Sequence, residues 1–299
     1  MQIATKTLEA IEVAMANDQG ATNRGLLRPL MAKAEDAYST DNTPFRNHLG
    51  ASLIGRECAR ELWYSFHWVT LKQFDARMLR LFNTGHLMEP KIVASLEMIG
   101  CKVYQFDGNG KQFRIVGHRK HFGGSCDAVV VGIPDLPAGQ AALAEFKSHG
   151  EKSFVKLKAA GLVAAKFEHY VQMLIYMSYF QLDYGLYVAQ NKNTDEIYSE
   201  IIQFNSDTAK RYFDRSAMII DSIEPPPRIG KTPGHFGCKF CDHIGACHRV
   251  GEYQIHRNCR TCSFSKVEDE GAWSCESFGT LSSSQQRLGC EHYQLNPKI

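Results

Sequence analysis

The chain has 299 residues, 44% of them hydrophobic, and its formal net charge at pH 7 is +2. That length suits one large domain, or one domain with appendages, and supplies enough apolar residues for a sizeable core. No run of about 18 apolar residues exists, which excludes a membrane-spanning helix, and the first ten residues lack the apolar stretch of a secretory signal. We therefore expect a cytoplasmic protein without membrane contact. Such a nearly neutral chain would attract nucleic acid only through local basic patches.

The N-terminal region, residues 1–74, is expected to be mainly helical. Apolar residues recur at helical spacing in three places, and Asn23 is placed to cap the second of these helices. The third helix carries Cys58. The predicted elements are helices over 4–17, 25–37 and 57–68, with a polar, turn-rich segment over 38–48.

The central region, residues 75–224, alternates strand and helix patterns, which predicts an α/β core with a mixed sheet flanked by helices. Turn formers at 107–110 and 191–194 predict two hairpins. Pro90 lies inside the first helix and Gly161 interrupts a later one. Helices are expected over 75–99, 152–181 and 206–222, and strands over 102–106, 113–117, 125–131, 142–147, 184–190 and 196–204.

A run of three prolines at 225–227 opens the third region, residues 225–299, where cysteines accumulate. Seven of the ten cysteines lie there. In a chain without a secretory signal, cysteines clustered in this way usually hold metal rather than form disulfides. Cys101 and Cys126 have no such neighbours, and we expect them to be buried core thiols.

The candidate chemistry lies in the central region. Asp127 follows Gly-Gly-Ser-Cys, and Glu145-Phe-Lys147 comes eighteen residues later. Side chains two apart share a face of a strand, so Glu145 and Lys147 lie on one side of the sheet. Two carboxylates and the backbone carbonyl of Phe146 supply the oxygen ligands that magnesium prefers. Lys147 would then face a phosphate or the attacking water. The pattern predicts a nuclease.

Two helices carry further candidates. His86, in Gly-His-Leu-Met-Glu, can complete the metal shell, since imidazole also suits manganese. Glu89 lies one turn further along on nearly the same face. Gln172 and Tyr176 are four residues apart on a later helix and can hydrogen-bond a DNA phosphate or the attacking water.

The order Gly-His, Gly-x-x-Asp, Glu-x-Lys, Gln-x-x-x-Tyr resembles the PD-(D/E)xK nuclease superfamily, in its RecB-like branch, over residues 50–250. The family's proline before the first acid is not evident, since Ser125 and Cys126 precede Asp127. The resemblance implies a restriction-endonuclease-like core that hydrolyses phosphodiesters. By position, the family's metal-binding and catalytic residues carry over to His86, Asp127, Glu145, Lys147, Gln172 and Tyr176.

Cysteines on both sides of this core extend the resemblance. Cys58-Ala-Arg-Glu-Leu-Trp63 is similar to the Cys-x-Arg-x-Leu-Trp signature of the iron–sulfur members of the branch. The resemblance implies a 4Fe–4S cluster on Cys58, Cys238, Cys241 and Cys247, closing a loop of roughly 180 residues. The alternative is a zinc site made by the C-terminal segment alone, with His243, His248 or Cys259 as fourth ligand and Cys58 a buried helix residue.

A second set of four cysteines contains one tight pair, which suits tetrahedral zinc, and His256 or His292 can replace a cysteine there. The alternative is a disordered tail. Trp273, Phe278 and Tyr293 argue against disorder because they can pack around a small metal knuckle. The set consists of Cys259, Cys262, Cys275 and Cys290.

Basic residues follow the acidic strand directly. Lys152, Lys156 and Lys158 can track phosphates without reading bases, and Phe154 can stack a base. The alternative is an ordinary solvated helix face with Phe154 in the core.

The resemblance implies a Mg²⁺- or Mn²⁺-dependent deoxyribonuclease, in particular an exonuclease. Its substrates would be single-stranded DNA or duplex ends, in recombination, repair, phage DNA processing or CRISPR adaptation. A recombination or replication protein is the expected partner, in a bacterial or phage-infected cytoplasm. Two other functions stay open: a catalytically silent module that binds DNA or protein, and a redox sensor built around the iron–sulfur cluster.

Overall fold

A computed structural model describes residues 1–18, 21–33, 45–71, 74 and 76–299. The chain divides into two compact units, each assembled from three segments. Unit 1 comprises Met1–Asn42, Phe74–Arg114 and Ser125–Ala209, and unit 2 comprises Thr43–Gln73, Ile115–Gly124 and Lys210–Ile299. The segment that carries Cys58 and the cysteine-rich C-terminal residues therefore belong to the same unit.

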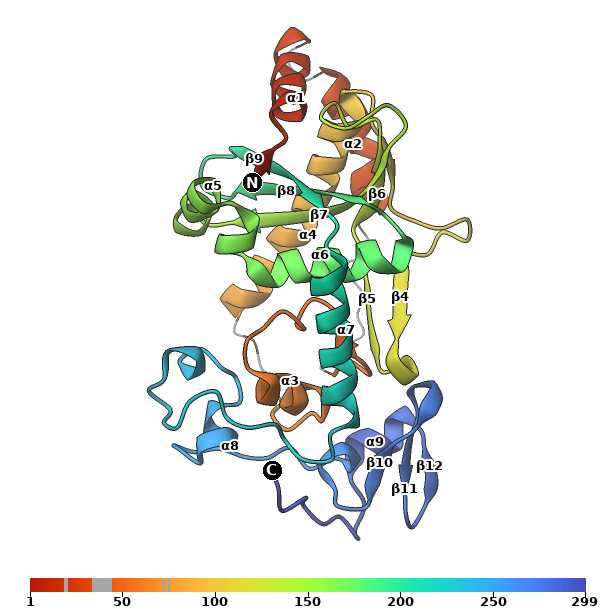
Figure 1. The fold of residues 1–299 in the computed structure, drawn as a ribbon, viewed down its shortest axis with the longest axis vertical. Helices are drawn as coiled ribbons and strands as arrows, with labels where there is room; N and C mark the ends of the chain where they lie inside the picture. The colour runs from red at the N-terminus through yellow and green to blue at the C-terminus, as the bar shows by residue number, and fades with distance from the viewer. Residues whose placement is uncertain (19–20, 34–44, 72–73, 75) are drawn as a thin grey trace. The chain divides into compact units, whose positions relative to one another are not determined.

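Unit 1 is built on a six-stranded mixed sheet in the order β1-β9-β8-β7-β6-β3. Its two central strands, β7 and β8, pair in parallel, and the other neighbours pair antiparallel. The strands are β1 (Gln2–Ile3), β3 (Lys102–Tyr104), β6 (Ala128–Val131), β7 (Ala141–His149), β8 (Tyr184–Asn191) and β9 (Ile197–Gln203). The expected mixed sheet flanked by helices is confirmed (Figure 1).

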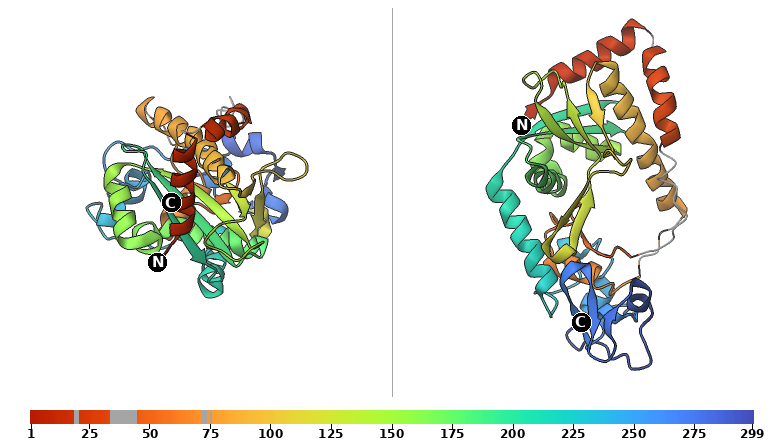
Figure 2. Two further views of the ribbon diagram at one scale, coloured as in Figure 1. Left: turned by 90° about the horizontal axis from the view of Figure 1, so that it is seen from above. Right: turned by 90° about the vertical axis from the view of Figure 1, so that its right-hand side faces the viewer.

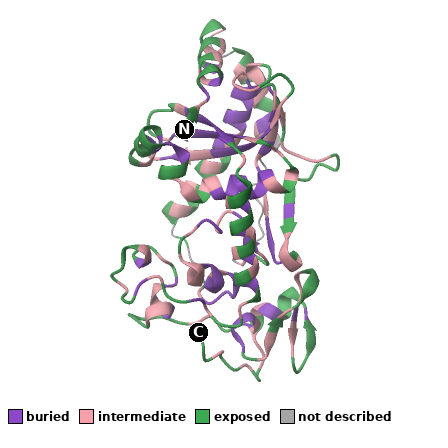
Figure 3. Cartoon of the chain, viewed as in Figure 1, coloured by how far each residue is buried: buried purple, intermediate pink, exposed green. Residues whose placement is uncertain are grey.

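Helices cover both faces of this sheet (Figure 2). Even-numbered residues of β7, such as Ala144 and Phe146, join Ile92 and Leu96 in the main core, so this face packs on the N-terminal helices. The opposite face meets the later pair of helices. The first group is α1 (Thr5–Asn17), α2 (Ala21–Lys33) and α4 (Ala76–Met98); the second is α5 (Glu151–Ala165) and α6 (Phe167–Phe180). Burial in unit 1 follows β7, β8, the centre of α6 and the inner side of α4 (Figure 3).

The predicted strand over 125–131 is two strands. β5 (Phe122–Ser125) ends before Cys126, and β6 begins at Ala128. The ladder breaks because a side chain replaces a backbone partner: the Asp127 carboxylate accepts the Phe146 N–H at 2.7 Å. Cys126 N–H turns instead to the carbonyl of Phe113. The break leaves Asp127 between two strands rather than within one.

The first predicted hairpin is also different. The turn at 107–110 forms, because the Asp107 carboxylate accepts the N–H groups of Asn109 and Lys111. Its arms, however, meet only at the Phe106–Gln112 bridge. β3 goes on to pair with β6, whereas β4 (Arg114–Gly117) pairs with β5. The turn-forming residues thus correctly predicted that the chain reverses direction here. They did not predict that the strands on either side of the turn belong to different sheets.

The helix predictions are mostly confirmed, with two details changed. α2 begins at Ala21, so Asn23 lies inside the helix and does not cap it. The Asp18 carboxylate takes the capping role instead, because it accepts the Thr22 N–H at 2.7 Å. Residues 34–37 of the predicted helix lie outside the described residues. Gly161 interrupts α5 as expected, with φ 74 and ψ 171.

Unit 2 contains two small sheets and several short helices. One sheet has the order β2-β5-β4, and the other β10-β11-β12. The elements of unit 2 not yet given are β2 (Leu49–Gly50), β10 (Ser265–Val267), β11 (Trp273–Cys275), β12 (Gly279–Leu281), α3 (Ala59–Phe66), α8 (Ile244–His248) and α9 (Ser283–Leu288). One boundary between the two units falls inside α7 (Ser206–Asp221). Short 3-10 turns lie at His118–Lys120, Phe236–Cys238, Cys259–Thr261 and Asp269–Gly271.

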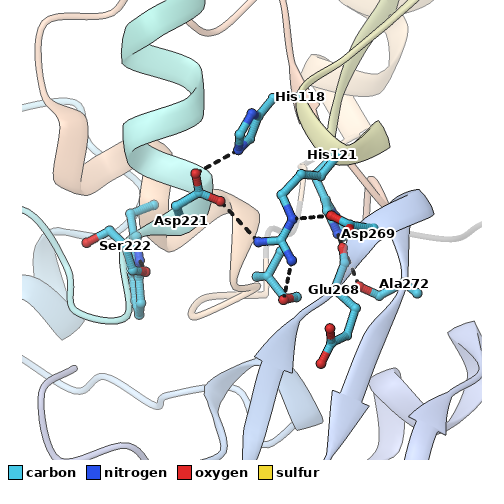
Figure 4. A network of polar contacts seen from close by, with 10 residues as sticks. His118, His121, Asp221, Ser222, Glu268, Asp269 and Ala272 are labelled. Atoms are coloured by element: carbon cyan, nitrogen blue, oxygen red, sulfur yellow. Dashed lines mark hydrogen bonds and ion pairs between the residues drawn. The ribbon is translucent and has the colours of Figure 1, made fainter.

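A polar network joins two of the three segments of unit 2 (Figure 4). The Arg119 guanidinium donates to Asp269 at 2.7 Å and to Asp221 at 3.1 Å, and His118 also bonds to Asp221. Nearby, His121 Nε2 donates to the carbonyls of Glu268 and Ala272. These bonds tie the β10–β11 sheet to the end of α7 and to the turn at His118–Lys120.

Nowhere in the described ranges is there a helix with the length and apolar character needed to span a membrane.

Candidate active site

Strand β7 places the two central candidates. Glu145 and Lys147 share one face, and the Lys147 ammonium bonds to Glu145 Oε1 and lies 3.2 Å from the Phe146 carbonyl oxygen. Asp127 approaches from the break between β5 and β6, with its Oδ2 4.0 Å from Lys147 Nζ. The pleat of β7 and the neighbouring strand break therefore gather Asp127, Glu145 and Lys147, as the sequence predicted.

Glu145 is fully buried, and its Oε2 has no hydrogen-bond partner among the described residues. Burial raises the pKa of Glu145, and the Lys147 charge acts in the opposite direction. Burial by itself would lower the pKa of Lys147, but the carboxylates of Glu145 and Asp127 outweigh it and raise that pKa. Lys147 is therefore a charged ammonium beside two acidic side chains, and one buried Glu145 oxygen lacks a hydrogen-bond partner among the described residues.

A third carboxylate reaches this group from α4, and it is Glu89. Burial, followed by the Asp127 charge, raises the pKa of Glu89 to about 7, while Lys147 acts to lower it. His86, the metal ligand predicted on this helix, has an exposed side chain. The sequence already indicated that Glu89 could lie near this group, because it is one helical turn from His86. The role of His86 stays a prediction.

Gln172 and Tyr176 face the same group from α6. Both are buried. Burial, and then the charges of Glu145 and Asp127, raise the pKa of Tyr176. The hydroxyl is thus neutral and lies within electrostatic reach of both carboxylates. The contact of Gln172 and Tyr176 with a DNA phosphate or the attacking water stays a prediction.

The face of β7 continues past Lys147 to His149, which the sequence analysis did not single out. The Tyr187 hydroxyl lies 2.9 Å from His149 Nε2 and 2.9 Å from His169 Nδ1, so it donates to one ring and accepts from the other. Burial, and then the charges of Lys166 and Lys147, lower the pKa of His149 to about 4. The neutral imidazole ring of His149 therefore follows Lys147 along this strand, and the neutral ring of His169 stacks beside it.

The lysines predicted to contact DNA lie on α5. Lys152 and Lys156 are exposed, whereas Lys158 forms an ion pair with Glu196. Phe154 is fully buried, so the prediction that its ring stacks a base is wrong: this side chain belongs to the core. The exposed lysines remain candidates for phosphate contacts.

The first cysteine quartet is gathered in unit 2. One pocket is lined by all four of its members, together with Arg60, Glu61 and His243. Burial, followed by the neighbouring Cys58 and Cys247 thiols, raises the pKa of Cys238. Thiols that disfavour one another's ionisation in this way are a suitable donor set for a bound cation. The four residues are Cys58, Cys238, Cys241 and Cys247.

The second quartet lines a separate pocket of unit 2. His292, Phe278 and Tyr293 lie on the same walls, as the predicted knuckle requires. Burial raises the pKa of Cys259, with smaller contributions from its three partners. The four residues are Cys259, Cys262, Cys275 and Cys290. Lining one pocket does not by itself make these side chains metal ligands. Among the described residues, there is no group of at least three histidine, cysteine, aspartate or glutamate side chains arranged to hold a metal ion.

Comparisons with known proteins give structural likeness only. No protein-family model matches the chain, and no curated protein matches it. Among solved structures, SSO0001 matches with a TM-score of 0.43 and 19% identity over 78% of this chain and 99% of its own. An alkaline exonuclease, LHK-Exo from Laribacter hongkongensis, matches with a TM-score of 0.43 and 15% identity over 58% of this chain and 86% of its own. Its complex with dAMP matches with a TM-score of 0.41 and 16% identity over the same shares. At these values the likenesses carry no argument about activity, which has to come from the site itself.

Proposed function

We propose that this protein is a metal-dependent DNA nuclease, and specifically an exonuclease. The observation that supports this best is Glu145, a fully buried carboxylate with one unpartnered oxygen, beside the charged Lys147. A buried carboxylate oxygen without a partner costs stability unless a ligand satisfies it. A divalent cation with its bound waters is the ligand that fits, because magnesium needs only one or two protein carboxylates.

Each residue then has a role set by its position. Asp127 and Glu145 would hold Mg²⁺ or Mn²⁺ with the Phe146 carbonyl, and His86 or Glu89 would complete the shell from α4. The ion supplies charge neutralisation and an activated water. Lys147 Nζ, pinned between Glu145 and the Phe146 carbonyl, is held where an added negative charge on a phosphate would be stabilised. The neutral Tyr176 hydroxyl would donate to a phosphate oxygen, with Gln172 beside it on α6.

The substitution Glu145→Gln tests the proposal, because it keeps the shape of the side chain and removes its charge. We expect magnesium-dependent degradation of end-labelled DNA to fall by about 100-fold or more, and Lys147→Gln to have a similar effect. Glu12→Gln, an exposed change on α1, serves as the control and should cut at the wild-type rate. A Glu145→Gln protein with unchanged thermal unfolding and undiminished cleavage would overturn the assignment.

We further propose that unit 2 carries two metal centres. The cysteines at 58, 238, 241 and 247 would bind a 4Fe–4S cluster, and those at 259, 262, 275 and 290 a zinc ion. What supports both is that the four members of each quartet line one pocket, and that in the first quartet Cys58 is about 180 residues from its three partners. Both centres would be structural, since nothing in the proposed hydrolysis needs an electron.

A further inference from the structure

Two aromatic rings stand out from the surface of unit 2. Phe236 is 85% exposed and Phe240 is 83% exposed. They flank Cys238, which is buried and lines the first cysteine pocket. An isolated exposed apolar side chain needs no explanation, but two almost fully exposed phenylalanines four residues apart on one loop do.

The backbone of this loop is ordered by successive turns. Cys238 N–H donates to the His235 carbonyl at 2.8 Å, Lys239 N–H to the Phe236 carbonyl at 3.3 Å, and Cys241 N–H to the Cys238 carbonyl at 3.1 Å. The rings therefore project from a hydrogen-bonded scaffold anchored by buried Cys238. A preformed platform loses little conformational entropy when a ligand covers it.

One lysine lies over one of the two rings, and other exposed cations occur on the same stretch of chain. The Lys239 ammonium lies 5.5 Å from the centre of the Phe240 ring. Lys231, Lys239 and Arg249 are all exposed, and Asp242 is the only acidic residue between 230 and 250. Neither lysine takes part in an ion pair within the described residues. The surface thus combines flat apolar rings with free cations, which suits a ligand that has flat bases and a regular negative charge.

We infer that this surface, Phe236, Phe240, Lys231 and Lys239, binds single-stranded nucleic acid. Bases would stack on the two rings, which accept any base because every base has a π-face. The lysines would contact the phosphates. An apolar protein partner would leave these ammonium groups at the edge without a counter-charge. The inference deepens the proposed function, since the bound strand would be the nuclease's substrate, but binding can be measured without cleavage.

The experiment uses the full-length protein carrying Glu145→Gln, so that a fluorescent single-stranded oligonucleotide of mixed sequence stays intact. In this background we expect Phe236→Ala and Phe240→Ala each to weaken the Kd roughly tenfold. The slope of log Kd against log salt should not change for these variants, because no phosphate contact is lost. Lys231→Gln and Lys239→Gln should each lower that slope by about 0.7.

Replacement by other apolar residues separates stacking from simple apolar contact. Phe236→Trp and Phe240→Trp should retain binding. Phe236→Leu and Phe240→Leu should bind as weakly as the alanine variants. Ile223→Ala, which removes an apolar side chain that is 81% exposed, should bind like the parent. Equal metal content and thermal unfolding in every variant exclude a folding defect.

Unchanged Kd values for both Ala variants would overturn the inference. So would Leu variants that bind as well as Phe, because that result indicates an apolar protein contact. Both outcomes are independent of whether the wild-type protein cuts DNA, which the Glu145 experiment decides.

Discussion

At the scale of single residues, buried polar side chains determine how unit 2 responds to its environment. His67 stacks on Trp63 with ring centres 3.6 Å apart, and its Nδ1 lies 3.0 Å from the Trp63 carbonyl oxygen. Beside it, the Arg260 guanidinium lies 3.7 Å from the centre of the Trp68 ring. Burial is the main cause that lowers the pKa of His67 to about 3, and the Arg260 and His121 charges add to the effect. His67 is thus a neutral ring in the folded protein.

This residue predicts a pH dependence of stability. In the unfolded chain a histidine takes up a proton near pH 6.5, whereas folded His67 does so only near pH 3. The unfolded state therefore binds more protons between these values. The stabilisation is complete above pH 6.5 and is lost as the pH falls, by at most ~1.4 kcal/mol per pH unit.

Thermal unfolding followed from pH 7 to pH 4.5 checks this prediction. His67→Gln should reduce the loss of stability on acidification, while His86→Gln, at an exposed position in unit 1, should leave it unchanged. The difference between the two variants isolates His67 from the acid sensitivity of the cysteine sites. Identical pH profiles for wild type and His67→Gln would contradict it.

At the scale of secondary-structure elements, Gly161 decides where α5 breaks. Its φ of 74 and ψ of 171 lie in a region that essentially only glycine adopts. After the break, the Leu162 N–H donates to the buried Glu200 carboxylate at 2.8 Å. The break therefore exchanges a helical hydrogen bond for a bond to β9, which fixes the end of α5 on the sheet.

Gly161→Ala should destabilise unit 1 by about 1–3 kcal/mol, the usual cost of a non-glycine residue in such a conformation. The added methyl group would also lie 2.8 Å from Met1 Sδ, but that side chain can move, so the backbone decides the effect. Gly25→Ala is the matched control. Gly25 lies within α2 with open space around it, so alanine there should stabilise by about 0.5–1 kcal/mol. Denaturant unfolding of both variants should thus give shifts of opposite sign.

At the scale of the whole molecule, the chain is interleaved, since each unit draws on three separated segments. In unit 2, Cys58 comes from the first segment and its three proposed partners from the last, yet all four line one pocket. A bound cluster would therefore close a very long loop, which restricts the unfolded chain more than a short loop does. The expected consequence is that iron and the stability of unit 2 are lost together.

Protein purified without oxygen should be brown and contain about four irons for each chain. Cys58→Ala should lose the iron and lower the melting temperature, because a partial ligand set holds the cluster poorly. Cys101→Ala removes a buried thiol elsewhere, and it should keep the full iron content. Zinc in place of iron in the wild-type protein, or full iron content in the Cys58→Ala variant, would refute the cluster.

The sequence by itself determined which residue types could meet. Strand periodicity put Glu145 and Lys147 on one face, and the helical spacing of Gln172 and Tyr176 put both toward one neighbour. These rules act between residues close along the chain, so they need no knowledge of the fold. Cys101 and Cys126 were likewise correctly expected to be buried.

Only the tertiary structure decided the rest. The break at Asp127 depends on the Phe146 N–H, which another strand provides. The choice of Glu89 as the carboxylate near Asp127 depends on how α4 is rotated against β6 and β7, and the burial of Phe154 depends on what α5 covers. In each case the deciding contact comes from a residue distant in sequence, and packing energy, not local periodicity, selects it.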